Sequence, residues 1–117
     1  MENEKILVGV PYLEEADVVK GGVKPYVTNG KPVVMMVQAG YCGHCTTAKP
    51  AFQKFADSAK NVTVVTIQAD GRGGEAVKAF QVPGYPAYLG FNKNGQLVKA
   101  HDGNRDVASL KQFAQSL

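Results

Sequence analysis

Residues 33–45 read Val-Val-Met-Met-Val-Gln-Ala-Gly-Tyr-Cys-Gly-His-Cys, and this stretch decides the fold of the chain. Its first five residues form an unbroken apolar run, which predicts a strand buried on both faces of a mostly parallel sheet. From about Cys42 to Lys60, apolar residues recur at steps of three and four, which predicts an amphipathic helix. Cys45 lies on the expected buried face of this helix, and Lys49 lies on the opposite face.

The segments that follow alternate between strand and helix. Residues 62–68 are rich in β-branched side chains and predict a second strand, so that strand, helix and strand form a right-handed βαβ unit. A short helix is expected at about residues 75–80, followed by strands at 87–91 and 96–100. These two strands flank Asn94-Gly95, whose residues both tolerate the positive φ of a tight hairpin turn.

The two ends of the chain complete the predicted architecture. Residues 6–10 predict a short first strand. Residues 13–29 are ambiguous, with a helical pattern over 13–20 that Gly21-Gly22 stops. Asp106 is the expected N-cap of a last helix. The fold class is therefore α/β, with a central mixed sheet and helices on both of its faces. A chain of 117 residues is expected to form one domain, over residues 1–117.

The composition is that of an ordinary globular protein, with 44% hydrophobic and 20% charged residues and a net charge of +3. The Lys and Arg residues are scattered, which argues against a nucleic-acid partner. No apolar run approaches the length of a membrane span, so no membrane association is expected. Residues 1–5 do not read as a secretory signal. We therefore expect a cytoplasmic protein, with a monomer as the simplest state.

The chain has two cysteines, Cys42 and Cys45, and so short a ring adds little stability as a staple. At the start of a helix, backbone N–H groups and the helix dipole favour a thiolate at Cys42. Cys42 is then the exposed attacking sulfur and Cys45 the buried resolving sulfur. Gly43 keeps the approach open, and a protonated His44 further stabilises the Cys42 thiolate. The position of the two cysteines therefore favours thiol reactivity over a structural disulfide.

Two alternatives compete with a redox role for this pair. The cysteines could form half of a zinc site, but a structural zinc needs four ligands and the chain offers only His44 and His101 besides. They could also be inert core thiols, although the strand–CxxC–helix context argues against this. We therefore expect no metal and no bound cofactor.

Over about residues 30–117 the chain resembles the thioredoxin superfamily. Residues 41–45, Tyr-Cys-Gly-His-Cys, are similar to the family active site, with the Gly-His pair of protein disulfide isomerase domains. Pro50 matches the helix-kinking proline, Gly84-Tyr85-Pro86 the loop that faces the disulfide, and Gly103 a family glycine. The resemblance implies the thioredoxin fold and a cis Tyr85–Pro86 bond. It also implies a substrate-binding surface for an extended segment beside the sulfurs, formed by Tyr41, Gly43, Gly84, Tyr85, Pro86 and Gly103.

Three positions depart from the family pattern. Tyr41 stands where the family usually has tryptophan. Met36 stands where the family has a buried acid that takes the proton of the second cysteine, and Thr66 replaces the lysine that accompanies this acid. The cost of these changes is expected to fall on the resolving step. Arg105 resembles an arginine that can swing toward the buried cysteine of protein disulfide isomerase domains, or it is an ordinary solvated side chain.

These observations predict a thiol–disulfide oxidoreductase that acts on protein disulfides and is recycled by a separate reductase or the glutathione pool. One alternative is a binding module with little redox turnover, which Met36 and Thr66 favour. The other alternative is a glutaredoxin-like enzyme that uses glutathione as its substrate. Against it, the sequence has no basic cluster near the cysteines that would bind the glutathione carboxylates. The direction of exchange stays open, because the Gly-His pair predicts an oxidising couple and a cytoplasmic location predicts a reducing role.

Overall fold

The computed structural model describes residues 6–117 and shows a five-stranded sheet in the order β1-β5-β4-β6-β7. A separate two-stranded sheet pairs β2 with β3. The strands are β1 (Tyr12–Leu13), β2 (Val18–Val19), β3 (Gly22–Val23), β4 (Val33–Gln38), β5 (Thr63–Gln68), β6 (Ala87–Phe91) and β7 (Leu97–His101). The helices are α1 (Pro25–Thr28), α2 (Gly43–Ser58), α3 (Gly74–Phe80) and α4 (Val107–Gln115), with a short 3-10 helix at Glu15–Asp17.

The central strand β4 is buried along its whole length, as its apolar run predicts. It pairs in parallel with β5 and antiparallel with β6, so the sheet is mixed. Because neighbouring side chains of a strand point to opposite faces, β4 supplies two separate cores. Val34 and Met36 belong to one hydrophobic cluster, and Val33, Met35 and Val37 belong to the other.

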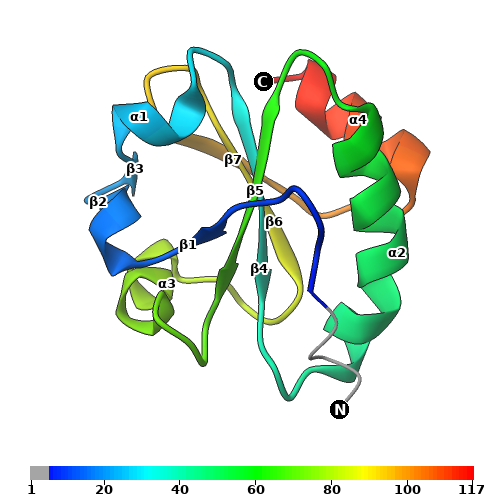
Figure 1. Ribbon diagram of the computed structural model, residues 1–117, viewed down its shortest axis with the longest axis horizontal. Coiled ribbons are helices and arrows are strands. Elements are labelled where there is room, and N and C mark those ends of the chain that lie inside the picture. Colours follow the sequence, from blue (N-terminus) through cyan, green and yellow to red (C-terminus); the bar gives the residue numbers. More distant parts are fainter. Residues whose placement is uncertain (1–5) are drawn as a thin grey trace.

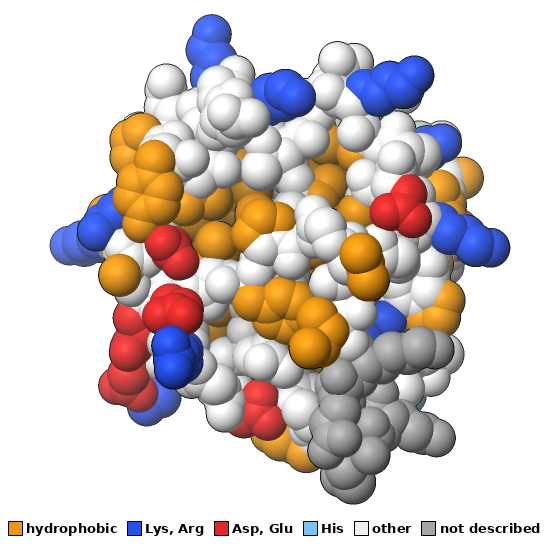
Figure 2. All heavy atoms as spheres, in the orientation of Figure 1, with side chains coloured by type: hydrophobic (Ala, Val, Ile, Leu, Met, Phe, Trp, Pro, Cys, Tyr) orange, Lys and Arg blue, Asp and Glu red, His pale blue; other side chains and the backbone are white. Residues whose placement is uncertain are grey.

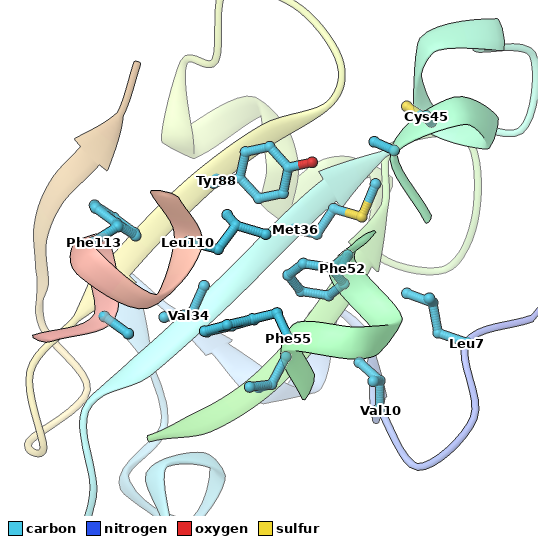
Figure 3. Packing of buried hydrophobic residues seen from close by; sticks show 13 residues of the cluster. Leu7, Val10, Val34, Met36, Cys45, Phe52, Phe55, Tyr88, Leu110 and Phe113 are labelled. Atoms are coloured by element: carbon cyan, nitrogen blue, oxygen red, sulfur yellow. The ribbon is translucent and has the colours of Figure 1, made fainter. Parts of the chain in front are cut away.

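Helices cover both faces of the sheet (Figure 1). Phe52 and Phe55 of α2 and Leu110 and Phe113 of α4 pack into the cluster that contains Met36 (Figure 3). The helix α3 packs on the opposite face, and α1 lies on that side as well. The predicted α/β class, with a mixed sheet between two helical layers, is confirmed. Among the described residues, no helix is long and apolar enough to cross a membrane.

Most predicted elements agree with the structure to within two residues. The strand at 87–91 and the helix near 75–80 appear as β6 and α3. Asp106 is the N-cap of α4, and its side chain accepts a hydrogen bond from the Ser109 N–H at 2.7 Å. Gly95 adopts a φ of 90°, the left-handed conformation expected in the hairpin turn.

The predicted strand at residues 6–10 is wrong, because the first strand is β1 at Tyr12–Leu13. Gly9 has a φ of 73°, which interrupts an extended backbone. The segment instead packs on α2, where the Gln53 side chain accepts from the Val8 N–H at 2.7 Å and donates to the Val8 carbonyl at 2.8 Å. A glutamine thus replaces the hydrogen bonds that a neighbouring strand would supply.

The helical pattern at residues 13–20, within a stretch that the sequence leaves ambiguous, does not form an α-helix. Only one 3-10 turn forms, and the Asp17 carboxylate accepts hydrogen bonds from the Glu14 N–H at 2.8 Å and the Tyr26 hydroxyl at 2.6 Å. These two hydrogen bonds lower the pKa of Asp17. The chain then extends into β2, whose β-branched residues pair with β3. Residues 1–5, on which the signal-peptide argument rested, lie outside the described part of the chain.

Replacing Gly22 with alanine is expected to lower the free energy of unfolding by about 1–3 kcal/mol. A Cβ atom at this position would overlap the carbonyl group of Gly95, where β3 meets the β6–β7 hairpin. Urea unfolding followed by circular dichroism measures this loss. Gly84→Ala is the matched control, because a Cβ atom there meets nothing within 4 Å. Equal stability of the two variants would contradict the prediction.

Candidate functional site

The two cysteines lie where β4 leads into α2. Cys42 is the N-cap of α2, with an extended backbone (φ −95°, ψ 109°), and its Sγ accepts a hydrogen bond from the Cys45 N–H at 3.1 Å. The pair is in the dithiol form. A sulfur at this position takes the place of an N-cap oxygen, and a negative charge on it is stabilised by the N–H groups and dipole of the first turn. The local structure therefore favours a thiolate at Cys42.

The loop between α3 and β6 forms the other wall of the site. The Cys42 thiol donates to the Tyr85 carbonyl oxygen at 3.5 Å, and the Tyr85–Pro86 peptide bond is cis. The rings of Tyr41 and Tyr85 meet edge to face, with centroids 6.5 Å apart. The structure thus brings together Tyr41, Cys42, Tyr85 and Pro86, which the sequence analysis placed in one site. Cys42 is partly buried, so it is less exposed than predicted.

Cys45 is fully buried, as predicted from its place on the apolar stripe. Burial, together with a side-chain hydrogen bond to Cys42, raises the pKa of the Cys45 thiol to about 12, although a backbone hydrogen bond of Ala39 and the charge of Lys49 act in the opposite direction. Cys45 therefore keeps its proton at neutral pH. A reaction that uses Cys45 as a nucleophile needs surroundings that stabilise its thiolate.

Lys49 does not lie on the exposed face of α2, as the helical pattern predicted, but is only 4% exposed. It follows Cys45 by one turn of the helix, so that both side chains share one face. The segment of Leu7 and Val8 lies over this part of α2, lining a pocket together with Lys49 and Pro50. A long aliphatic stem makes such burial tolerable for a lysine. Burial lowers the pKa of Lys49.

The positions that depart from the family pattern are filled without a buried charge. Met36 is fully buried, and the Thr66 hydroxyl donates to the Met36 carbonyl oxygen at 2.7 Å. The same hydroxyl accepts from the Gln38 side-chain amide at 2.7 Å. Gln38 of β4 and Thr66 of β5 are thus two buried neutral side chains that hydrogen-bond to each other.

Sequence reasoning missed Tyr88 as a functional candidate. This residue of β6 is paired with Met36 of β4 and is only 2% exposed. Its position two residues after Pro86 is a sequence signal for a place near the site, because alternate residues of a strand face the same side. Tyr88 and Cys45 belong to the same buried cluster.

The remaining predicted site residues lie in the first turn of α2 and in the segment between β7 and α4. Gly43 and His44 are exposed in the first turn of α2, and a Cβ atom at Gly43 would meet nothing within 4 Å. Gly103 lies beside the His101 ring. Arg105 is exposed in the segment before α4, and its charge acts on Tyr88.

Figure 2 shows that most Lys and Arg side chains stand apart around the edge of the visible face, whereas several Asp and Glu side chains gather at its lower left, with a Lys or Arg side chain among them. Within residues 6–117, no three His, Cys, Asp or Glu side chains gather as metal ligands would.

Comparisons with known proteins identify the family of the chain. The family model described as Thioredoxin matches residues 18–116. Protein disulfide-isomerase tigA of Aspergillus niger is 32% identical over 89 residues, which cover 73% of this chain and 24% of that protein. Putative thioredoxin-like protein 453L of Invertebrate iridescent virus 6 is 37% identical over 98 residues, which cover 70% of each chain. The chain spans about a quarter or less of the length of the disulfide isomerases that it matches.

A solved structure shows the same fold. The crystal structure of thioredoxin F from spinach chloroplast, in its short form, superposes with a TM-score of 0.74 at 20% identity. The similarity covers 96% of this chain and 96% of that chain.

Proposed function

The chain belongs to the thioredoxin family, and from this premise we propose that it is a thiol–disulfide oxidoreductase acting through Cys42 and Cys45. The observation that carries the proposal is the arrangement of the two thiols. Cys42 caps α2, where a thiolate is stabilised, and Cys45 lies buried one turn further along with its N–H directed at the Cys42 sulfur. This arrangement combines an accessible nucleophile with a second thiol held within reach of it.

The exchange takes place in two steps. The Cys42 thiolate attacks one sulfur of a substrate disulfide, forms a mixed disulfide and expels the other sulfur as a thiolate. Cys45 then loses its proton to solvent and attacks the Cys42 sulfur, which breaks the mixed disulfide and releases the second substrate sulfur. The substrate gains two electrons, and the Cys42–Cys45 disulfide is left on the protein. Oxidation of a dithiol substrate follows the same steps in reverse.

The substrates in this proposal are protein disulfides. The loop before β6 supports this, because the Tyr85 carbonyl oxygen lies beside the Cys42 sulfur and its backbone can pair with an extended segment. Tyr41 is 75% exposed and supplies an aromatic rim next to Tyr85. A separate reductase or the glutathione pool returns the pair to the dithiol. The monomeric state and the cytoplasmic location stay predictions.

The first test is a redox titration of the protein in glutathione buffers, followed by alkylation of the thiols. We expect one transition in which both thiols disappear together as the internal disulfide forms. His44→Pro is expected to shift the midpoint to a more reducing potential by at least about 30 mV, because it removes a positive charge that favours the thiolate. His44 is exposed, so the fold should tolerate this change. A pair that never closes into an internal disulfide would contradict the proposed function.

A protein-binding module with little turnover is the second candidate, and the neutral residues at positions 36 and 66 favour it. Met36 and Thr66 supply no charged group to take the Cys45 proton. If this candidate is correct, Cys42→Ser should leave the affinity for partner chains intact. Fast turnover of small glutathione mixed disulfides would instead indicate the glutaredoxin-like alternative.

A further inference from the structure

Tyr88 carries a buried hydroxyl group that the fold itself does not use. Its ring packs between Phe52 of α2 and His101 of β7, with centroid distances of 5.8 and 6.2 Å. The hydroxyl has no hydrogen-bond partner among the described residues. A buried hydroxyl without a partner costs stability, and phenylalanine would fill the same space without that cost. Packing alone therefore does not explain why this position carries a tyrosine.

The position of Tyr88 directs this hydroxyl toward the thiol pair. Tyr88 is paired with Met36 across β4 and β6, so both side chains enter the layer that α2 covers. Figure 3 shows the hydroxyl end of Tyr88 pointing to the side of the cluster on which Met36 and Cys45 lie. Met36 is the position at which the family resemblance places a proton-accepting acid. The phenolic O–H of Tyr88 thus lies on the same side of the sheet as Met36, the position at which the family has its acid.

The electrostatics of the cluster make Tyr88 a donor. Burial raises the pKa of Tyr88 to about 12, with Arg105 acting in the opposite direction and Cys45 in the same direction. The hydroxyl therefore keeps its proton at neutral pH. Cys42 and Lys49 act on Cys45 through their charges, and a backbone hydrogen bond of Ala39 lowers the pKa of Cys45. The charge of Cys45 in turn acts on Tyr88 of β6. The charge of Arg105, in the segment before α4, also acts on Tyr88.

We propose that the Tyr88 hydroxyl donates a hydrogen bond to the Cys45 sulfur when this sulfur becomes negative, and so assists the resolving step in place of a buried acid. The inference rests on the proposed function. As Cys45 loses its proton to solvent, its thiolate attacks the Cys42 sulfur and forms the Cys42–Cys45 bond. The bond between Cys42 and the substrate sulfur breaks, and that sulfur leaves with the electron pair. Tyr88 keeps its proton and stabilises the attacking charge.

The experiment is a stopped-flow reaction of the dithiol protein with 5,5′-dithiobis(2-nitrobenzoate), which reports the two steps separately. Attack by Cys42 releases the first thionitrobenzoate, and attack by Cys45 on the resulting mixed disulfide releases the second. In Tyr88→Phe we expect the first phase to be unchanged and the second to be about tenfold slower. This corresponds to a pH profile of the second phase that is displaced upward by about one unit.

The controls separate this role from a structural one and from failure of the proposed function. Tyr88→Phe should unfold at the same or a higher urea concentration, because it removes a hydroxyl without a partner. Tyr26→Phe removes an exposed hydroxyl on α1 and should leave both phases unchanged. An unchanged second phase in Tyr88→Phe, from about pH 6 to about pH 9, would overturn the inference and leave the proposed function standing. Absence of the second phase in the unmodified protein would overturn both.

Discussion

Replacing Cys42 with serine is expected to slow the reduction of a protein disulfide by at least about a thousandfold. The reaction begins with a thiolate at the start of α2, and a serine hydroxyl at neutral pH is a far weaker nucleophile toward sulfur. The fold should not change, because serine is itself a preferred N-cap residue and its oxygen can accept from the Cys45 N–H in place of the sulfur. The measurement is dithiothreitol-driven turnover of a disulfide-bonded protein substrate, with circular dichroism as the check of folding.

Cys45→Ser is the matched control for this prediction. It retains the attacking sulfur and loses only the resolving one, so it should form a mixed disulfide with the substrate and fail to release it. Mass spectrometry is expected to detect the trapped adduct with Cys45→Ser and none with Cys42→Ser. The opposite pattern of adducts would assign the attacking role to Cys45, and undiminished turnover in Cys42→Ser would remove the cysteine pair from the reaction altogether.

Replacing Met36 with aspartate is expected to lower the free energy of unfolding by about 3 kcal/mol or more at neutral pH. Met36 is fully buried in the cluster that contains Phe52 and Tyr88. Its neighbour on β5 is Thr66, a neutral residue whose hydroxyl already donates to the Met36 carbonyl oxygen. A carboxylate at this position would lose its hydration without gaining the lysine that accompanies it in the family pattern.

The pH dependence of this loss has a definite sign. Burial raises the pKa of the new carboxyl group in the folded state above its unfolded value of about 3.9. The group is neutral in both states below that value, so the ionisation penalty is small near pH 4 and grows as the pH rises toward the folded pKa. Urea unfolding at about pH 4 and about pH 8 measures the difference. Met36→Leu preserves the volume and should cost less than about 1.5 kcal/mol at either pH. A loss that is equal at the two pH values would contradict the account.

The central elements could be predicted from the sequence because their signals are local. The apolar run of β4, the three-and-four spacing of α2, the Asn94-Gly95 turn and the Asp106 cap each depend on residues within one element or one turn. The placement of Cys42 at the start of a helix and of Cys45 on its buried face follows from the same signals. The short elements before β4 were mispredicted, because side chains distant in sequence, such as Gln53 and Tyr26, hold the backbone there.

The sequence by itself determined the α/β class, the βαβ unit around residues 33–68 and the candidate cysteine pair. The tertiary structure alone decided which groups surround Cys45. Lys49 lines a pocket together with Leu7 and Val8, and Tyr88 joins the cluster of Cys45 because β6 is aligned with β4 in one register. Such neighbours arise from pairings between distant segments. A shift of one residue in strand register would turn Tyr88 to the opposite face, and no local pattern in the sequence records that register.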